Sequence, residues 1–338
     1  MSLRQIFLAT TMLVASAAAA EAAPKVVASI KPIHSLVASV MEGVGAPDLI
    51  VEGAGSPHTY ALRPSQAREI EQADIVFWVG HELEPFLEKP LESLGAKADV
   101  VELADSPGLT LLAPREGGAF EKHDHHHDGA EEGEEHHGEG EDRDHDAAGA
   151  EDHDHDAAEH EHEHGETDPH LWLDPRNAAA MLPAIEQALA KADPDHAGIY
   201  KANAEKTAAR LAGLEDKLSG ALAPVKDKPF IVFHDAYQYF EQRFGLAAAG
   251  SITISPEVAP GAERVTEIRH KLADTHATCV FSEPQFEPKI ISVIIEGSDA
   301  HSGLLDPLGA ALQPGPDLYF EVLENLSASF RECLSPQG

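Results

Sequence analysis

Segments typical of β-strands and α-helices alternate in the same order in both halves of this 338-residue chain. The strand-like segments are short and apolar, as in ADIVFWVG (73–80) and PFIVFHDAY (229–237), and the segments between them have helical spacing, as in PSQAREIEQA (64–73). Strands that alternate with helices form parallel sheets. We therefore predict an α/β fold with two lobes, each built on a parallel sheet of roughly four strands flanked by helices.

A long helical region separates the two halves. Pro194 divides it into two helices, and the second, from about residue 195 to 222, contains no proline. At 1.5 Å per residue this helix spans about 40 Å, which is long enough to act as a rigid spine between the lobes. The predicted boundaries are an N-terminal lobe at 24–175, linking helices at 176–224 and a C-terminal lobe at 225–338.

The first 23 residues have the pattern of a secretory signal peptide. Arg4 precedes the apolar run IFLATTMLVASAAAA, and small residues around Ala20 and Ala22 offer a cleavage site. A membrane anchor is the alternative, but the apolar run is short and rich in alanine. We predict that the protein is exported.

Residues 121–166 form a tract rich in histidine and acid, inside the first lobe. The tract has 20 Asp and Glu against one Lys and one Arg, a charge of −18 out of the chain's −35. The tract has few apolar side chains to bury, so we expect it to be disordered. It is either an acidic linker or a set of weak zinc sites, since imidazole and carboxylate both bind zinc. Its histidines favour metal binding; they are His123, His125, His126, His127, His136, His137, His145, His153, His155, His160, His162 and His164.

The rest of the chain is also acidic, which argues against nucleic acid or an anionic membrane surface as a partner. It contains two cysteines, Cys279 and Cys333. In an exported protein such a pair usually forms a disulfide, here between the C-terminus and a strand of the last lobe; two buried free thiols are the alternative.

Three histidines outside the tract lie at or near the ends of predicted strands, where parallel sheets bind ligands. His58 follows the strand DLIVEG, His234 ends the strand PFIVF, and His170 lies where ordered structure resumes after the tract. A cleft between the lobes would bring them together as a metal site, with Asp306 or a water as a fourth donor. Asp235 is expected to support the site or the fold. The remaining histidines are interpreted as surface or structural residues: His34, His81, His196, His270, His276 and His301.

Several segments resemble the zinc-binding proteins of bacterial ABC importers, the ZnuA type: KPIHSLVASVM, SPHTYALRPSQAREIEQADIVFWVG, DPHLWLDP, FHDAYQYFEQRFGL, CVFSEPQFEPKIISVI and LLDPLG. The resemblance covers nearly the whole mature chain. It implies two α/β lobes joined by a rigid long helix, with Zn²⁺ bound in the cleft by His58, His170 and His234. It also implies a histidine-rich acidic loop between the first two ligands, and a disulfide that matches Cys279 and Cys333.

The chain departs from this pattern at one position. Some relatives carry a Glu immediately before the first histidine as a possible fourth donor, and here that residue is Pro57. The fourth ligand is therefore water or Asp306, which matches an aspartate used in other branches of the family. Related manganese-binding proteins place a Glu where this chain has His234, and a neutral imidazole favours zinc over manganese.

The expected function is zinc capture in the periplasm and delivery to an ABC permease in the inner membrane, whose cytoplasmic ATPase drives import. The protein is expected to act as a monomer and not as an enzyme. One alternative is a zinc hydrolase, for which Glu283 in FSEP is the best candidate general base, although its other reading is a supporting carboxylate. Another alternative is a periplasmic zinc buffer or adhesin with no transporter.

Overall fold

The computed structural model describes residues 23–115, 120, 167–253, 260–286 and 289–335. The predicted signal peptide, up to residue 22, and the twelve histidines of the tract lie outside the described residues.

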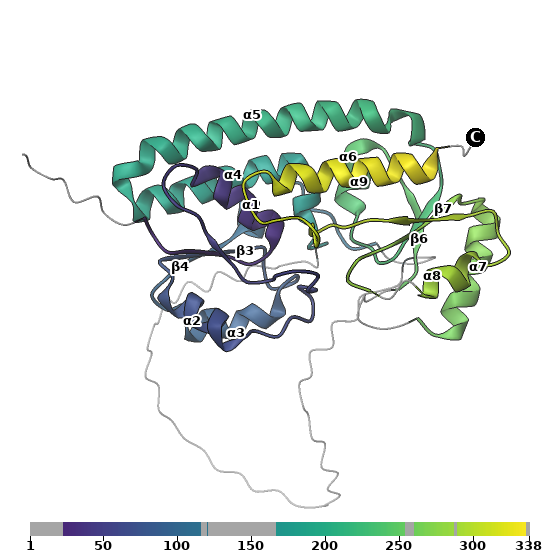
Figure 1. Cartoon of the computed structure of the whole chain (residues 1–338), viewed down its shortest axis with the longest axis horizontal. Helices are drawn as coiled ribbons and strands as arrows, with labels where there is room; N and C mark the ends of the chain where they lie inside the picture. Colours follow the sequence, from purple (N-terminus) through teal and green to yellow (C-terminus); the bar gives the residue numbers. More distant parts are fainter. Residues whose placement is uncertain (1–22, 116–119, 121–166, 254–259, 287–288, 336–338) are drawn as a thin grey trace, which may run out of the picture.

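The first lobe is built on a four-stranded parallel sheet with the strand order β2-β1-β3-β4. Figure 1 shows α2 and α3 on one face of this sheet and α1 and α4 on the other. The strands are β1 (Val26–Ala28), β2 (Asp48–Leu49), β3 (Ile75–Trp78) and β4 (Asp99–Glu102). The helices before the tract are α1 (Lys31–Val40), α2 (Pro64–Gln72), α3 (Pro85–Ser93) and the short 3₁₀ turn η1 (Leu103–Asp105).

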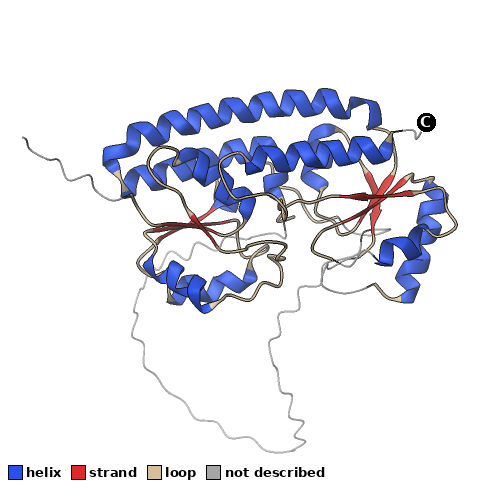
Figure 2. Ribbon diagram, in the orientation of Figure 1, coloured by secondary structure: helices blue, strands red, loops and turns tan. Residues whose placement is uncertain are grey.

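The second lobe repeats this arrangement, with the parallel strand order β6-β5-β7-β8. Its strands are β5 (Phe230–Val232), β6 (Ala248–Ser251), β7 (Cys279–Ser282) and β8 (His301–Leu304). Its helices are α6 (Gln238–Phe244), α7 (Ala262–Thr275), α8 (Lys289–Ile295) and α9 (Leu318–Leu334). The expectation of two lobes with parallel sheets of four strands is confirmed. Figure 2 shows the two sheets at separate places along the molecule.

The long helix α5 runs along one side of both lobes (Figure 1). Its 26 residues span about 39 Å. It buries Tyr200, Leu211, Leu214, Leu218 and Leu222 and packs against α1, α4 and α9. The segments around it are η2 (Leu171–Leu173), α4 (Pro175–Ala192), η3 (Pro194–His196), α5 itself (Ala197–Leu222) and η4 (Ala223–Val225).

A single buried apolar cluster reaches through both lobes. It contains Phe77 of the first sheet, Leu214 of α5, and Phe230 and Phe281 of the second sheet. A smaller cluster around Ile231 packs the other face of the second sheet against α7 and α8. Because the main core continues from one lobe to the other, the spine and both sheets are packed as one unit.

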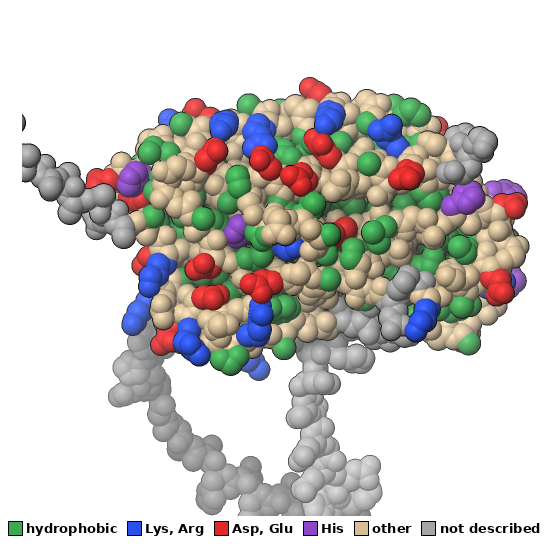
Figure 3. All heavy atoms as spheres, in the orientation of Figure 1, with side chains coloured by type: hydrophobic (Ala, Val, Ile, Leu, Met, Phe, Trp, Pro, Cys, Tyr) green, Lys and Arg blue, Asp and Glu red, His purple; other side chains and the backbone are tan. Residues whose placement is uncertain are grey.

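Charged residues of both signs cover the exposed side of α5, as the upper part of Figure 3 shows. Four charged residues of α5 form ion pairs with neighbouring elements, at Lys206–Glu42, Arg210–Asp317, Lys217–Glu324 and Glu215–Arg176. Exposed pairs of this kind add little stability, so the attachment of α5 rests on its apolar face.

Prolines lie in the first turn of two helices of the first lobe. Helix α2 starts with Pro64, and the Arg63 backbone N–H donates to Gln66 Oε1 at 2.9 Å. Helix α1 starts at Lys31, so Pro32 lies within its first turn. Proline suits the first turn of a helix because the N–H it lacks has no partner there.

A disulfide joins Cys279 in β7 to Cys333 in α9, with the two Cα atoms 5.9 Å apart. It ties the last helix to the second sheet across a sequence separation of 54 residues. Among the described helices, none combines the length and apolar character needed to cross a membrane.

Candidate metal centre

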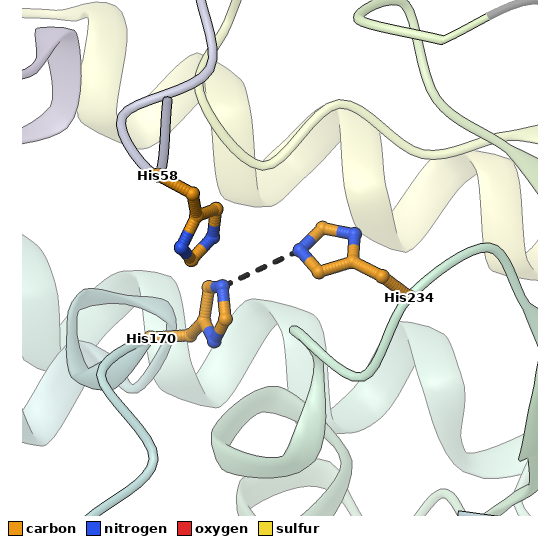
Figure 4. Close-up of side chains that lie close together, drawn as sticks. All are labelled: His58, His170 and His234. Atoms are coloured by element: carbon orange, nitrogen blue, oxygen red, sulfur yellow. Dashed lines mark hydrogen bonds between the residues drawn. The ribbon is translucent and has the colours of Figure 1, made fainter. Parts of the chain in front are cut away.

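His58, His170 and His234 come together between the lobes, and their rings face a common point (Figure 4). One ring nitrogen of each lies within 4.8 Å of those of the other two. The rings line a cavity of about 20 Å³, together with Pro57, Trp172 and Phe286 among others. The loops that carry them are far apart in sequence, so the fold assembles this site.

His58 is carried by the loop between β2 and α2. The start of this loop continues the first sheet, because the Ile50 N–H donates to the Ala28 carbonyl at 3.0 Å. Gln66 of α2 holds the same region, since its Nε2 donates to the Ile50 carbonyl at 2.6 Å. The preceding residue Pro57 is buried, and it brings no metal-binding atom to the position where some relatives carry Glu.

His170 is buried just before η2, and Asp168 orients its ring. Asp168 Oδ1 lies 2.8 Å from His170 Nδ1 and also accepts the His170 backbone N–H at 3.0 Å. A carboxylate only accepts hydrogen bonds, so the neutral ring donates from Nδ1 and keeps the lone pair of Nε2 directed into the cavity.

His234 follows β5 and has the same kind of support from the second lobe. Its Nδ1 lies 2.7 Å from Oε1 of Glu283, which is 3 % exposed and lies just beyond β7. Nearby Tyr237 is fully buried, and burial first and the Glu283 carboxylate second raise its pKa well above the usual value. Because Glu283 engages Nδ1 of His234, Nε2 is the ring atom that faces the other histidines.

The two supported rings meet at a separation that suits a tetrahedral metal ion. Nε2 of His170 and Nε2 of His234 are 3.4 Å apart (the dashed line in Figure 4). Two nitrogens at about 2.0–2.1 Å from zinc, at the tetrahedral angle, lie about 3.3–3.4 Å from each other. The residues present fit a borderline divalent cation, and the buried carboxylates behind them are the usual partners of metal-binding imidazoles.

Asp306 lies close to this site, but its carboxylate is used within its own loop. Oδ2 accepts the Ala310 N–H at 2.6 Å and Oδ1 accepts the Leu308 N–H at 3.3 Å. Lys31 of α1 fixes the same loop, since its Nζ donates to the carbonyls of Gly309, Ala310 and Leu312. Asp306 is not among the groups whose metal-binding atoms gather with those of the three histidines.

Asp235, the neighbour of His234, takes part in a buried ion-pair network. The Arg115 guanidinium donates to Asp235 and, through Nη1 at 2.8 Å, to Glu241 of α6. Burial raises the pKa of Asp235, and the Arg115 charge acts in the opposite direction. Asp235 thus anchors the chain before the tract to the second lobe, a structural role that the sequence interpretation had allowed.

The other described histidines lie apart from the three-histidine site. His34 is buried in α1, with Nε2 3.0 Å from the Pro47 carbonyl. His81 gathers with Glu82 and Glu102 at the edge of the first sheet, where His81 is exposed. Burial and the charges of Asp105 and Glu82 raise the pKa of Glu102 to about 7. No motif in the sequence pointed to this group.

The sequence interpretation did not connect Asp168 with His170. The signal was present, since Asp168 stands two positions before the histidine in DPH. Nothing in the spacing indicated that Glu283 and His234, 49 positions apart, would be partners. Only the pairing of β5 with β7 places the ends of these two strands side by side.

Comparison with known proteins shows the family to which this chain belongs. The family model for the periplasmic component A of the zinc-uptake complex, ZnuA, matches residues 26–333. The chain is 52 % identical over 343 residues to a high-affinity zinc uptake system protein ZnuA of Brucella suis, with 99 % of each chain covered. It is 43 % identical to the ZnuA of Paracoccus denitrificans, with 92 % of each covered.

Solved structures share the fold. One crystal structure titled ZnuA superimposes with a TM-score of 0.70 at 23 % identity, covering 93 % of this chain and all of the other. The laminin-binding adhesin of Streptococcus agalactiae gives 0.69 at 24 % identity, covering 92 % of this chain and all of the other. The family match over residues 26–333 and the relatives that cover nearly the whole chain identify it as a member of the ZnuA family, the periplasmic components of zinc-uptake complexes.

Proposed function

We propose that this protein captures one Zn²⁺ in the periplasm with His58, His170 and His234 and delivers it to an ABC permease for import. The observation that carries the proposal is the 3.4 Å separation of the His170 and His234 Nε2 atoms, the spacing of two donors on a tetrahedral zinc ion. The relatives that match the whole chain are named as zinc uptake proteins. The cytoplasmic ATPase of the importer would supply the energy.

The three histidines leave one coordination position, and we assign it to water. Asp306 was the other candidate, but its two carboxylate oxygens each accept a backbone N–H of their own loop. Moving it onto the metal would leave those N–H groups without their acceptor. A site with three neutral imidazoles and a water has the donor set that zinc accepts readily and that suits manganese less.

The proposed ligands are tested by zinc competition with a chelator at pH 7, using the full mature chain. Replacing His58, His170 or His234 singly by Ala should weaken the tight site by at least about 100-fold, because a metal with too few protein donors loses affinity steeply. The matched control is His270→Ala on the exposed side of α7. Unchanged affinity in all three ligand variants would refute the site.

Delivery is tested with the permease and its ATPase in proteoliposomes. Zinc uptake should depend on the zinc-loaded protein, and the His234→Ala variant should support little uptake. A protein that binds zinc tightly but leaves uptake unchanged would be a buffer instead. Size-exclusion chromatography with light scattering tests the expected monomer.

The hydrolase alternative depends on Glu283 as a general base, and its position disfavours that role. Its Oε1 is engaged with His234 Nδ1 at 2.7 Å, and the residue is almost completely buried. A carboxylate in that position orients a metal ligand. We expect the zinc-loaded protein to hydrolyse neither esters nor peptides; turnover that disappears in Glu283→Gln would favour the enzyme.

A further inference from the structure

Gln285 lines the same cavity as the three histidines, in the turn that follows β7. Both polar atoms of its side chain, Oε1 and Nε2, are buried, and neither has a hydrogen-bond partner among the described residues. Gln285 is two residues beyond Glu283, the carboxylate that supports His234. The chain therefore places an uncharged amide with unused hydrogen-bonding capacity at the candidate metal centre.

A buried amide without partners costs free energy, so folded proteins rarely contain one unless a water, an ion or a ligand completes it. The imidazoles beside it have partners on their outer side, at Asp168 for His170 and at Glu283 for His234. Around the amide, the cavity wall is largely apolar, with Pro57, Trp172, Phe286 and Leu308. The missing partner of Gln285 is then a molecule inside the cavity.

The cavity has room for such a molecule. Its volume is about 20 Å³, and about 10–15 Å³ is enough to hold one water. Zinc held by three imidazoles keeps one tetrahedral position, which a water usually fills. A zinc-bound water has two O–H groups to donate. Among the described residues, the metal-binding atoms that gather at this site belong to the three histidines, and none comes from a carboxylate.

We infer that Gln285 is the residue that holds the zinc-bound water, with its Oε1 accepting a hydrogen bond from that water. The inference rests on the proposed zinc site and extends it. Gln285 would be a positioning residue: it does not bind the metal, but it fixes the fourth ligand in a cavity whose walls offer few other partners. An uncharged acceptor adds no further charge to a site in which the Asp168 and Glu283 carboxylates already lie behind the imidazoles.

Replacing Gln285 by Leu keeps a similar volume and removes the acceptor. In the full mature chain, zinc affinity measured by chelator competition should fall about 10-fold, as it does when other partners of metal ligands are removed. The visible absorption of the Co²⁺-loaded protein should also change, because these bands report the geometry of the ligands. The thermal unfolding midpoint without metal should not fall, since the buried amide has no protein partner to lose.

Gln238→Leu is the matched control, because Gln238 also has a buried Oε1 without a partner but does not line the cavity. It should leave zinc affinity and the Co²⁺ spectrum unchanged. Wild-type affinity and spectrum in Gln285→Leu would overturn the inference while leaving the three-histidine site intact. If the wild-type protein itself binds no zinc tightly, the proposed function fails first.

A crystal structure of the zinc-loaded wild-type protein tests the same point without a substitution. It should contain a water about 2 Å from zinc and about 2.7–3.0 Å from Gln285 Oε1. A metal-bound Gln285, a metal-bound Asp306, or a water that does not contact Gln285 would each contradict the assignment.

Discussion

At the scale of single residues, the Glu283 carboxylate should strengthen zinc binding by His234. Its carboxylate contacts His234 Nδ1 at 2.7 Å in a buried environment. Glu283→Gln keeps the shape but removes the charge that makes the imidazole a stronger donor. We expect zinc affinity to fall about 10-fold by chelator competition. The exposed Glu324→Gln is the control, and equal affinity in both variants would contradict this role.

Glu84 gives a prediction about pH and stability, apart from the metal. It is completely buried, and burial raises its pKa to about 7 despite backbone N–H donors at Val79 and Gly80. A carboxyl whose folded pKa is raised contributes its stability below pH 4.5, and this stability is lost as the pH rises through about 7.

The advantage of Glu84→Gln over the wild type should therefore be less than about 1 kcal/mol at pH 5 and should grow to about 3 kcal/mol at pH 8. Gln keeps an oxygen that can accept from the Val79 and Gly80 N–H groups. Urea unfolding of both proteins at the two pH values measures the difference. Parallel pH dependences in the two proteins would show that Glu84 is ionised in the fold at both.

The sequence predicted a metal site at His58, His170 and His234 because each lies at or near the end of a predicted strand or where predicted structure resumes after the tract. Parallel sheets bind ligands beyond the carboxyl ends of their strands. The sequence left Asp306 and water as alternatives, since a loop carboxylate can turn either to a metal or to nearby backbone. The structure places the Asp306 oxygens on the N–H groups of Leu308 and Ala310. A choice of this kind depends on side-chain direction, which residue spacing does not encode.

At the scale of elements, Arg115 connects the chain before the tract to α6. Its guanidinium donates hydrogen bonds to Asp235 and Glu241, whose side chains are 8 % and 4 % exposed. Removing Arg115, which pairs with both of these buried carboxylates, leaves their charge uncompensated. Arg115→Met should lower the free energy of unfolding by about 3 kcal/mol in urea titrations at pH 7.

Arg176→Met is the comparison for this variant, because Arg176 pairs with Glu215 at the surface and is 64 % exposed. Its loss should cost less than about 1 kcal/mol. Similar losses in both variants would mean that the Arg115 network is no more than a surface ion pair.

The order of strands and helices was predictable because apolar runs and helical spacing alternate so regularly. Helix starts were less predictable, as Pro64 and Pro32 show. The first residue of a helix is the first to adopt helical backbone angles, and in this sequence either Pro64 or Ser65 could begin α2. The Arg115 network was not predictable either, since its members are 120 and 126 positions apart.

At the scale of the whole molecule, the tract at 121–166 leads to a prediction about the number of zinc sites. The chain on its two sides is held together, since the Asp168 N–H donates to the Leu112 carbonyl at 2.7 Å and Tyr239 of α6 bonds to both residues. Deleting residues 121–166 and joining the ends with a short Gly/Ser linker should leave one tight zinc site and remove the additional weak ones. Isothermal titration gives both stoichiometries, and loss of the tight site would contradict this separation of roles.

The packing of the whole molecule also predicts how it responds to zinc. Binding proteins that close around a ligand need lobes that rotate on a small hinge. Here α5 packs along both lobes, and the main buried cluster contains side chains of both sheets and of α5. Trp172, before α4, adds interlobe bonds, with its Nε1 donating to the Pro307 carbonyl and its own carbonyl accepting from Tyr319.

Rotating the lobes would open this shared core to water, so zinc binding should rearrange loops and not whole lobes. Small-angle scattering of the tract-deleted protein should give radii of gyration with and without zinc that agree within about 1 Å, because interior packing resists such a shift. Deleting the tract matters here, since metal binding to it would alter the scattering independently. A decrease in the radius of gyration of more than about 2 Å on adding zinc would show instead that the lobes close. Zinc would then be released to the permease by opening of the lobes and not by movement of the loop that carries His58.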